Sequence, residues 1–191
     1  MGYLGNQITT VFPTSISVDS ATISGNTTVG GTLGVTGATT LSNQLTDANM
    51  ASGSVLQAVT STRNTTQAES SNSFVTSSLA VAITPRSTSS KIFLTGTLFM
   101  GVVQGGQIHY NIYRDHGGTD ALVTTVTYGF GGFHINGSGG GESACPVAFL
   151  DSPSRTDEIT YTIYVQSTGT DNAQIHDNNR LSTLIAMEIQ G

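Results

Sequence analysis

Three consecutive six-residue units near the N-terminus constrain this chain more than any other feature. From Gly25 to Ser42 the sequence reads GNTTVG, GTLGVT and GATTLS, so each unit opens on glycine and has an aliphatic residue at its fifth place (Val29, Val35 and Leu41). One or two apolar residues per unit cannot form a core within a single chain, so such units are stable only when copies of the repeat meet. The repeat therefore predicts a thin β-structured shaft in which several chains share one axis, with glycine permitting close backbone approach.

Composition narrows the class of protein further. Charged residues make up 9% of the 191 residues, and 6 Lys and Arg face 12 Asp and Glu, for a formal net charge of −6. This balance favours a polar, uncharged β-protein and argues against nucleic-acid binding, which needs a basic surface. No apolar run is long enough to span a bilayer and the N-terminus lacks the pattern of a secretion signal, so we expect synthesis in the cytoplasm without membrane insertion. The single cysteine, Cys145, is expected to be a small buried hydrophobe in a strand.

The chain divides into three predicted parts: residues 1–24, a shaft and neck over residues 25–52, and a globular domain over residues 53–191. The first part is too short to fold alone and contains apolar residues among small polar ones. It is a candidate anchor that becomes ordered by docking on a larger partner, and the alternative is an unstructured tail. The candidate anchor residues are Tyr3, Leu4, Asn6 and Phe12.

From Gly53 onward, apolar and polar residues alternate between turn signals, as is typical of half-buried antiparallel strands. We expect strands at residues 55–60, 79–83, 92–102, 108–112, 122–128, 145–150, 159–165 and 183–189. About eight strands suffice for an all-β jelly roll of two packed sheets. The last strand has apolar residues on both of its faces, which predicts either a central strand or one pressed against a neighbouring subunit.

Several segments resemble recurring landmarks of a domain common in fibre proteins of tailed bacteriophages. These landmark segments are residues 53–57, 83–92, 150–153 with Tyr161 downstream, and 186–189, while residues 2–7 and 11–14 are similar to virion-attachment ends found especially in marine phages. The resemblance implies an intertwined homotrimer: a virion fibre or spike with a β-repeat shaft and a jelly-roll tip. It leaves open whether the fibre hangs from tail or capsid. The glycine-rich segment after Tyr128 is not among the shared landmarks.

That glycine-rich segment, residues 128–141 (YGFGGFHINGSGGG), is the predicted recognition site. Dense glycine frees the backbone to present the side chains between, here Tyr128, Phe130, Phe133, His134 and Asn136. Aromatic faces and amide or imidazole hydrogen bonds suit a neutral glycan or a peptide surface. The alternative is a flexible hairpin whose phenylalanines pack onto the sandwich or across a subunit boundary.

No catalytic, metal or cofactor site is predicted. The four histidines lack the spacing of a zinc site, although His109 could converge with its copies on a threefold axis. Residues 171–172 and 177–179 offer oxygen ligands without the EF-hand spacing, which favours turns over calcium. The sequence contains no GxSxG motif and no phosphate-binding loop.

The sequence thus predicts a structural fibre on the virion surface. Its partners would be its own copies, other virion proteins through the N-terminal segment, and a host-surface glycan or protein contacted by three tips at once. Two alternatives remain: a capsid decoration without specific receptor binding, and a polysaccharide-degrading spike with paired carboxylates supplied by different chains.

Overall fold

The computed structural model describes residues 28, 30–32, 34–37, 50–118, 120–124, 126, 129–169 and 173–191. The chain divides into two compact units, Met1–Ser42 and Asn43–Gly191. In the first unit, the described residues all belong to the repeat; they are exposed, and none of them lies in a strand or helix of this single chain. The shaft therefore stays a prediction, and the anchor residues Tyr3, Leu4, Asn6 and Phe12 lie outside the described residues.

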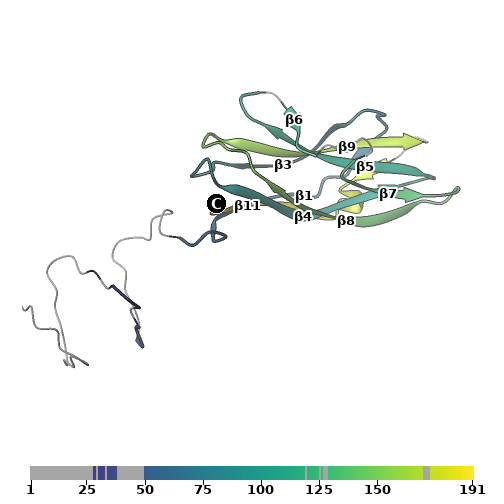
Figure 1. Ribbon diagram of the computed structural model, residues 1–191. Coiled ribbons are helices and arrows are strands. Elements are labelled where there is room, and N and C mark those ends of the chain that lie inside the picture. The colour runs from purple at the N-terminus through teal and green to yellow at the C-terminus, as the bar shows by residue number, and fades with distance from the viewer. Residues whose placement is uncertain are drawn as a thin grey trace, which may run out of the picture. The chain divides into compact units, whose positions relative to one another are not determined.

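The second unit is built from antiparallel strands (Figure 1). The strands are β1 (Val55–Arg63), β2 (Gln67–Glu69), β3 (Val75–Ile83), β4 (Lys91–Val102), β5 (Gly106–Asp115), β6 (Asp120–Leu122), β7 (Gly131–Ile135), β8 (Gly141–Asp151), β9 (Ile159–Gly169), β10 (Ala173–Ile175) and β11 (Ser182–Ile189). A single 3-10 turn, η2 (Asp177–Asn179), separates β10 from β11 among the described residues. No helix in the described part of the chain is long and apolar enough to cross a membrane.

The strands form two sheets. In the first sheet, which we call sheet A, β8 pairs with β4, and β4 pairs with both β10 and β11. β10 pairs in turn with β2, and β11 pairs with β1. In the second, sheet B, β3 pairs with β9, β9 with β5, and β5 with both β6 and β7. If β1 with β2, β6 with β7, and β10 with β11 are each counted as one interrupted strand, each sheet has four. This order is compatible with a jelly roll, as the alternation predicted.

The core lies between the two sheets and follows from the period of two along each strand. On β4, every second side chain is fully buried, from Ile92 and Leu94 to Leu98 and Met100. In the facing sheet, β9 does the same from Ile159 to Val165. Cys145 is a free, buried thiol in β8, as expected. β11 is a central strand between β1 and β4, which satisfies one of the two explanations for its doubly apolar pattern.

The strand expected over residues 122–128 is shorter than predicted. β6 ends at Leu122, and Val123, Thr124 and Val126 lie outside any strand. Thr124 is buried and its hydroxyl donates to the side-chain oxygen of Asn111 at 3.3 Å, so this connection covers part of the outer face of β5.

Two polar networks join the landmark segments. The buried carboxylate of Glu188 accepts hydrogen bonds from the Gln57 amide at 2.6 Å and from the backbone N–H of Arg86 at 2.7 Å. Asp151 accepts from the Tyr161 hydroxyl at 2.7 Å and from Arg114 at 2.7 Å. The landmarks thus meet in space, and both networks satisfy polar groups in or near the core, which is a structural role.

Candidate functional site

The two ends of the sandwich differ, and this difference positions the candidate site. At one end the chain enters the domain, where the Gly53 N–H donates to Gln190 O at 2.8 Å and the Gln190 N–H donates to Ser54 O at 2.8 Å. We call this end the base. At the other, distal end the β4–β5 and β7–β8 turns touch, with the Gly105 N–H donating to Gly139 O at 3.0 Å. β4 begins beside the base and, at about 3.3 Å per residue, carries the chain roughly 36 Å to the distal end.

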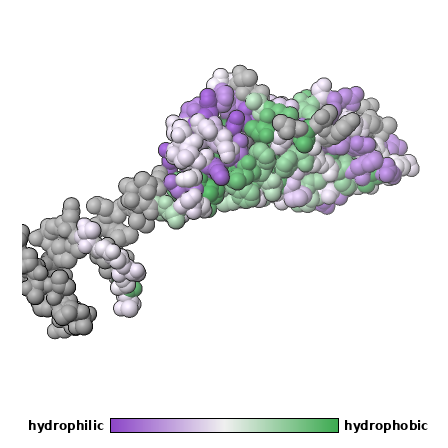
Figure 2. Space-filling model, in the orientation of Figure 1, coloured by the Kyte–Doolittle hydropathy of each residue, from purple (hydrophilic) through white to green (hydrophobic). Residues whose placement is uncertain are grey.

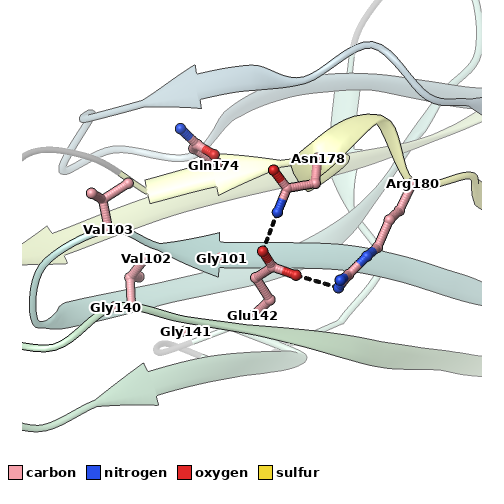
Figure 3. A pocket seen from close by; sticks show the side chains of 9 residues that line it. All are labelled: Gly101, Val102, Val103, Gly140, Gly141, Glu142, Gln174, Asn178 and Arg180. Atoms are coloured by element: carbon pink, nitrogen blue, oxygen red, sulfur yellow. Dashed lines mark hydrogen bonds and ion pairs between the residues drawn. The ribbon is translucent and has the colours of Figure 1, made fainter.

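A polar pocket of about 680 Å³ lies at the distal end on sheet A (Figure 3). Its centre is Glu142, near the start of β8, whose carboxylate receives hydrogen bonds from the Asn178 amide and pairs with Arg180. The guanidinium of Arg180 also lies 5.8 Å above the ring centroid of Phe99, which holds it over the sheet. The pocket is lined by Gly101, Val102, Val103, Gly140, Gly141, Glu142, Gln174, Asn178 and Arg180.

The chemistry of this pocket is that of hydrogen bonding. Its lining combines a carboxylate, a guanidinium and two amides, and the side chains of Glu142 and Arg180 remain 29% and 48% exposed. These groups offer both donors and acceptors to a polar ligand. The arrangement therefore fits recognition of a polar molecule.

This pocket is not predicted from the sequence. The residues 177–179 were interpreted as a turn, which the structure confirms: they form η2, with Asn178 and Asn179 at φ values of 52° and 57°. The other half of that interpretation, residues 171–172, lies outside the described residues. Nothing in the local sequence indicates that η2 sits over Glu142, which is 36 residues away from Asn178.

A second pocket, of about 570 Å³, lies on the other side of the touching turns. His134 and Asn136 from the predicted recognition segment help to line it, and both are exposed. Its lining residues are Gln104, Gly105, Gly106, Gln107, His134, Ile135, Asn136, Gly137, Ser138 and Thr168. Amides, hydroxyls and one imidazole thus converge here without a charged side chain among the described lining.

The phenylalanines of the predicted segment face the core. Phe130 makes edge-to-face contacts with Tyr110 and Phe149, at centroid separations of 5.9 and 5.8 Å. Phe133 also packs against the core. Tyr128 lies outside the described residues. Of the five predicted residues, the structure brings His134 and Asn136 together at one pocket and packs Phe130 and Phe133 against the core. Receptor contact by any of the five residues stays a prediction.

Part of the predicted recognition segment forms strand β7, Gly131–Ile135, and two glycines of this strand are required by packing. A Cβ at Gly131 would lie 2.5 Å from the Tyr110 ring, and one at Gly132 would lie 2.7 Å from both His109 Nδ1 and Ile108 O. β7 runs directly against β5, with Gly132 opposite His109 and Gly131 opposite Tyr110. The glycines allow this close approach, so the expectation that they free a loop backbone was wrong for these two positions.

The histidines occupy separate environments. His109 lies on the outer face of β5, where its Nε2 is 3.0 Å from Gln107 Oε1, and burial, with a smaller effect from His134, lowers its pKa. His176 is fully buried, its Nε2 lies 3.0 Å from Ser77 O, and burial lowers its pKa as well. No group of three His, Cys, Asp or Glu side chains that could hold a metal ion occurs within the described part of this single chain.

Solved structures similar to this chain include two of infectious bursal disease virus. No family model matches the chain, and no curated protein matches its sequence. A structure of infectious bursal disease virus, Gx strain, matches 72% of this chain and 34% of the viral chain, with a TM-score of 0.41 and 17% identity. The Gt strain matches 72% and 33%, with a TM-score of 0.39 and 14% identity. This chain spans about a third of either viral chain, and the arguments below rest on its own residues.

Proposed function

We propose that this protein is a structural virion fibre, a homotrimer that projects from a phage particle and contacts the host surface through its globular tip. Three features support the proposal: a glycine-led hexad repeat, an antiparallel sandwich that follows it in the chain, and the landmark segments within that sandwich. The observation that carries the host-contact part is the placement of both polar pockets at the distal end, away from the base where the chain enters.

A fibre needs no catalysis for this task. Three tips on one shaft, and several shafts on one particle, turn weak individual contacts into strong overall attachment. The pockets fit such weak, polar contacts with a glycan or a protein surface, because their donors and acceptors remain open to solvent. The N-terminal segment would hold the fibre on other virion proteins. Imaging the particle would distinguish a tail fibre from a capsid fibre.

The host-contact part is tested by point substitutions, because deleting residues 129–141 would remove β7 from sheet B. The test variant is Glu142→Ala with Arg180→Ala in the full chain. The matched control is Arg155→Ala with Asp157→Ala, which removes an exposed ion pair of the same two charge types from the loop that follows β8 at the base. The labelled proteins are bound to the bacterium on which a virus carrying this fibre is grown.

We expect at least a tenfold loss of cell binding for the distal variant and none for the control. A second variant, His134→Ala with Asn136→Ala, tests the other pocket in the same way. If every variant binds as the unchanged protein does, neither pocket contacts the host. If the unchanged protein itself does not bind, the adhesive role is wrong and a purely structural role replaces it.

A further inference from the structure

One half of the outer face of sheet A is apolar, and nothing in the described part of the chain covers it. Inward side chains of sheet A fill the core, and the alternate positions point outward. Near the base, those outward positions form what we call the apolar face. It consists of Ala58 on β1, Phe93 on β4, Ala148 and Leu150 on β8, and Ile185, Met187 and Ile189 on β11. Figure 2, which views the edge of the sandwich, shows hydrophobic residues over the middle of the visible side and hydrophilic residues toward its two ends.

The strand register makes these residues one continuous surface. Phe93 lies opposite Leu150 on one neighbouring strand and opposite Met187 on the other. Met187 in turn lies opposite Ala58. The next row places Ile185 opposite Thr95. Leu150 is 51% exposed, so the surface includes large hydrophobic side chains that water still reaches.

The character of the face changes along the strands. Beyond Ile185 comes a row of threonines, with Thr97 opposite Thr183, then Phe99 opposite Ala144, and then the charged pocket around Glu142 and Arg180. On the described outward positions from Phe93 to Thr97, and on those paired with them, no side chain is charged. The exposed Lys91, opposite Ile189, is the next outward residue of β4 and bounds the face at the base. The continuous apolar surface therefore lies in the half of the sheet nearest the base, and the outward Phe99 beyond it lies beneath the Arg180 guanidinium.

The absence of charge on this surface indicates what covers it. The chain has a formal net charge of −6, so two copies carry a net charge of the same sign. A surface that meets another copy of itself must avoid like charges, whereas a surface for a different, charged partner would display complementary ones. An uncharged apolar patch on an acidic chain fits a second copy of the same chain.

The path of the chain favours the same occupant. β1 begins at Val55, which is 52% exposed and lies opposite Ile189 at the base edge of the apolar face. The repeat lies only a short stretch upstream of that point. Three chains joined at the repeat would hold their apolar faces within reach at a high effective concentration, so even a modest contact area would be occupied.

We propose that the apolar face is the surface through which neighbouring copies of the tip pack against one another. This inference rests on the trimer of the proposed function and adds the surface that makes contact. It also explains why β11 is apolar on both faces: one face of β11 supplies the core and the other supplies the contact between copies.

Cysteine cross-linking in the full chain tests this. In a Cys145→Ser background, Thr95→Cys places a thiol in the middle of the apolar face, and Thr162→Cys places one on the outer face of sheet B as the matched control. Both positions are half-buried threonines within strands. After treatment with a short bismaleimide, we expect covalent multimers at least tenfold more abundant for Thr95→Cys than for Thr162→Cys. Adding Ile185→Lys to Thr95→Cys should reduce that yield at least tenfold.

The outcomes separate the inference from the function on which it rests. Light scattering first gives the mass of each variant. A trimer that cross-links at Thr162→Cys and not at Thr95→Cys overturns the apolar-face contact and leaves the fibre proposal standing. A monomer overturns the trimer and, with it, the contact. If Ile185→Lys prevents folding, the comparison of the two single cysteines decides alone.

Discussion

The network around Asp151 gives the sharpest test of how this fold is held together. Asp151 ends β8 in sheet A, and its partners Arg114 and Tyr161 lie on β5 and β9 of sheet B, so one carboxylate bridges the two sheets. The side chain of Asp151 is only 12% exposed and that of Arg114 21%. The replacement Asp151→Asn keeps the shape but removes the charge that both partners face.

The expected cost follows from these contacts. A hydrogen bond to a charged group contributes about 1.5–3 kcal/mol to stability, and a partly buried guanidinium that loses its counter-charge adds to the loss. We therefore expect Asp151→Asn to lower the free energy of unfolding by about 2–3 kcal/mol, which in a chain of this size lowers Tm by roughly 4–12 °C. The exposed pair Arg155–Asp157, at 3.5 Å, supplies the control, because Asp157→Asn should cost about 0.5 kcal/mol or less.

The assay is urea unfolding at one fixed protein concentration, since association shifts the apparent stability. A double-mutant cycle with Tyr161→Phe isolates the contribution of the Tyr161 hydroxyl. The loss of unfolding free energy caused by Tyr161→Phe should be about 1 kcal/mol smaller when residue 151 is already asparagine. Equal stabilities for Asp151→Asn and Asp157→Asn would refute the assignment of Asp151 as a bridge between the sheets. Additive effects in the cycle would refute the contact with Tyr161.

Three further predictions concern single groups. Burial, with a smaller effect from Cys145, raises the pKa of Tyr110 to about 12. The stability that the protonated Tyr110 contributes is therefore complete below pH 10 and is lost as the pH rises toward 12. In Tyr110→Phe, the free energy of unfolding should depend less on pH over that range. Burial lowers the pKa of His176, so the stability that the neutral His176 contributes is present above pH 6.5 and is lost as the pH falls below that value. Asparagine tolerates the local φ of 55°, so His176→Asn is the suitable replacement. In this variant the free energy of unfolding, measured by the same assay, should depend less on pH in the acid range. Gly132→Ala should destabilise the protein by about 1–3 kcal/mol because the new Cβ meets His109 and Ile108 O, whereas Gly139→Ala, with open space around it, should be nearly neutral; equal melting temperatures for the two would contradict the packing role of Gly132.

Much of the sandwich is predictable because the alternation of apolar and polar residues along a strand indicates which side chains face the core. Residues 92–102 alternate strictly on the core side, and the structure extends that strand by one residue, to Lys91. The doubly apolar β11 is also predictable, because both of its faces need a hydrophobic neighbour. Local alternation does not indicate which strand pairs with which, and for that reason the glycine-rich sequence of β7 predicts a loop. The glycines of β7 are needed because the Tyr110 and His109 side chains of β5, which are distant in sequence, lie against them.

The distal pocket is not predictable from the sequence either, because it also depends on which strands pair. Its ion pair joins Glu142 to Arg180, and its amide comes from Asn178 in a turn between two strands of one sheet. The sequence marks that turn by its asparagines, but which carboxylate lies beneath it depends on the register of β8 against β4. The polar networks of the landmarks are similar: Gln57 and Glu188 are recognisable as separate segments, and their contact appears only when β1 pairs with β11.

The two proposals make different demands on one sheet, and the gradient along sheet A reconciles them. Packing between copies needs a desolvated surface, whereas host contact needs side chains that stay in water. Rows of Phe93 and Ile185 lie toward the base, and Glu142 and Arg180 lie toward the distal end, with threonines between them. Copies that met through the apolar half would therefore leave the polar half free. A substitution in one half should consequently leave the function of the other intact: Ile185→Lys should abolish cross-linking at Thr95→Cys without changing the cell binding of a single tip, and Glu142→Ala with Arg180→Ala should do the reverse.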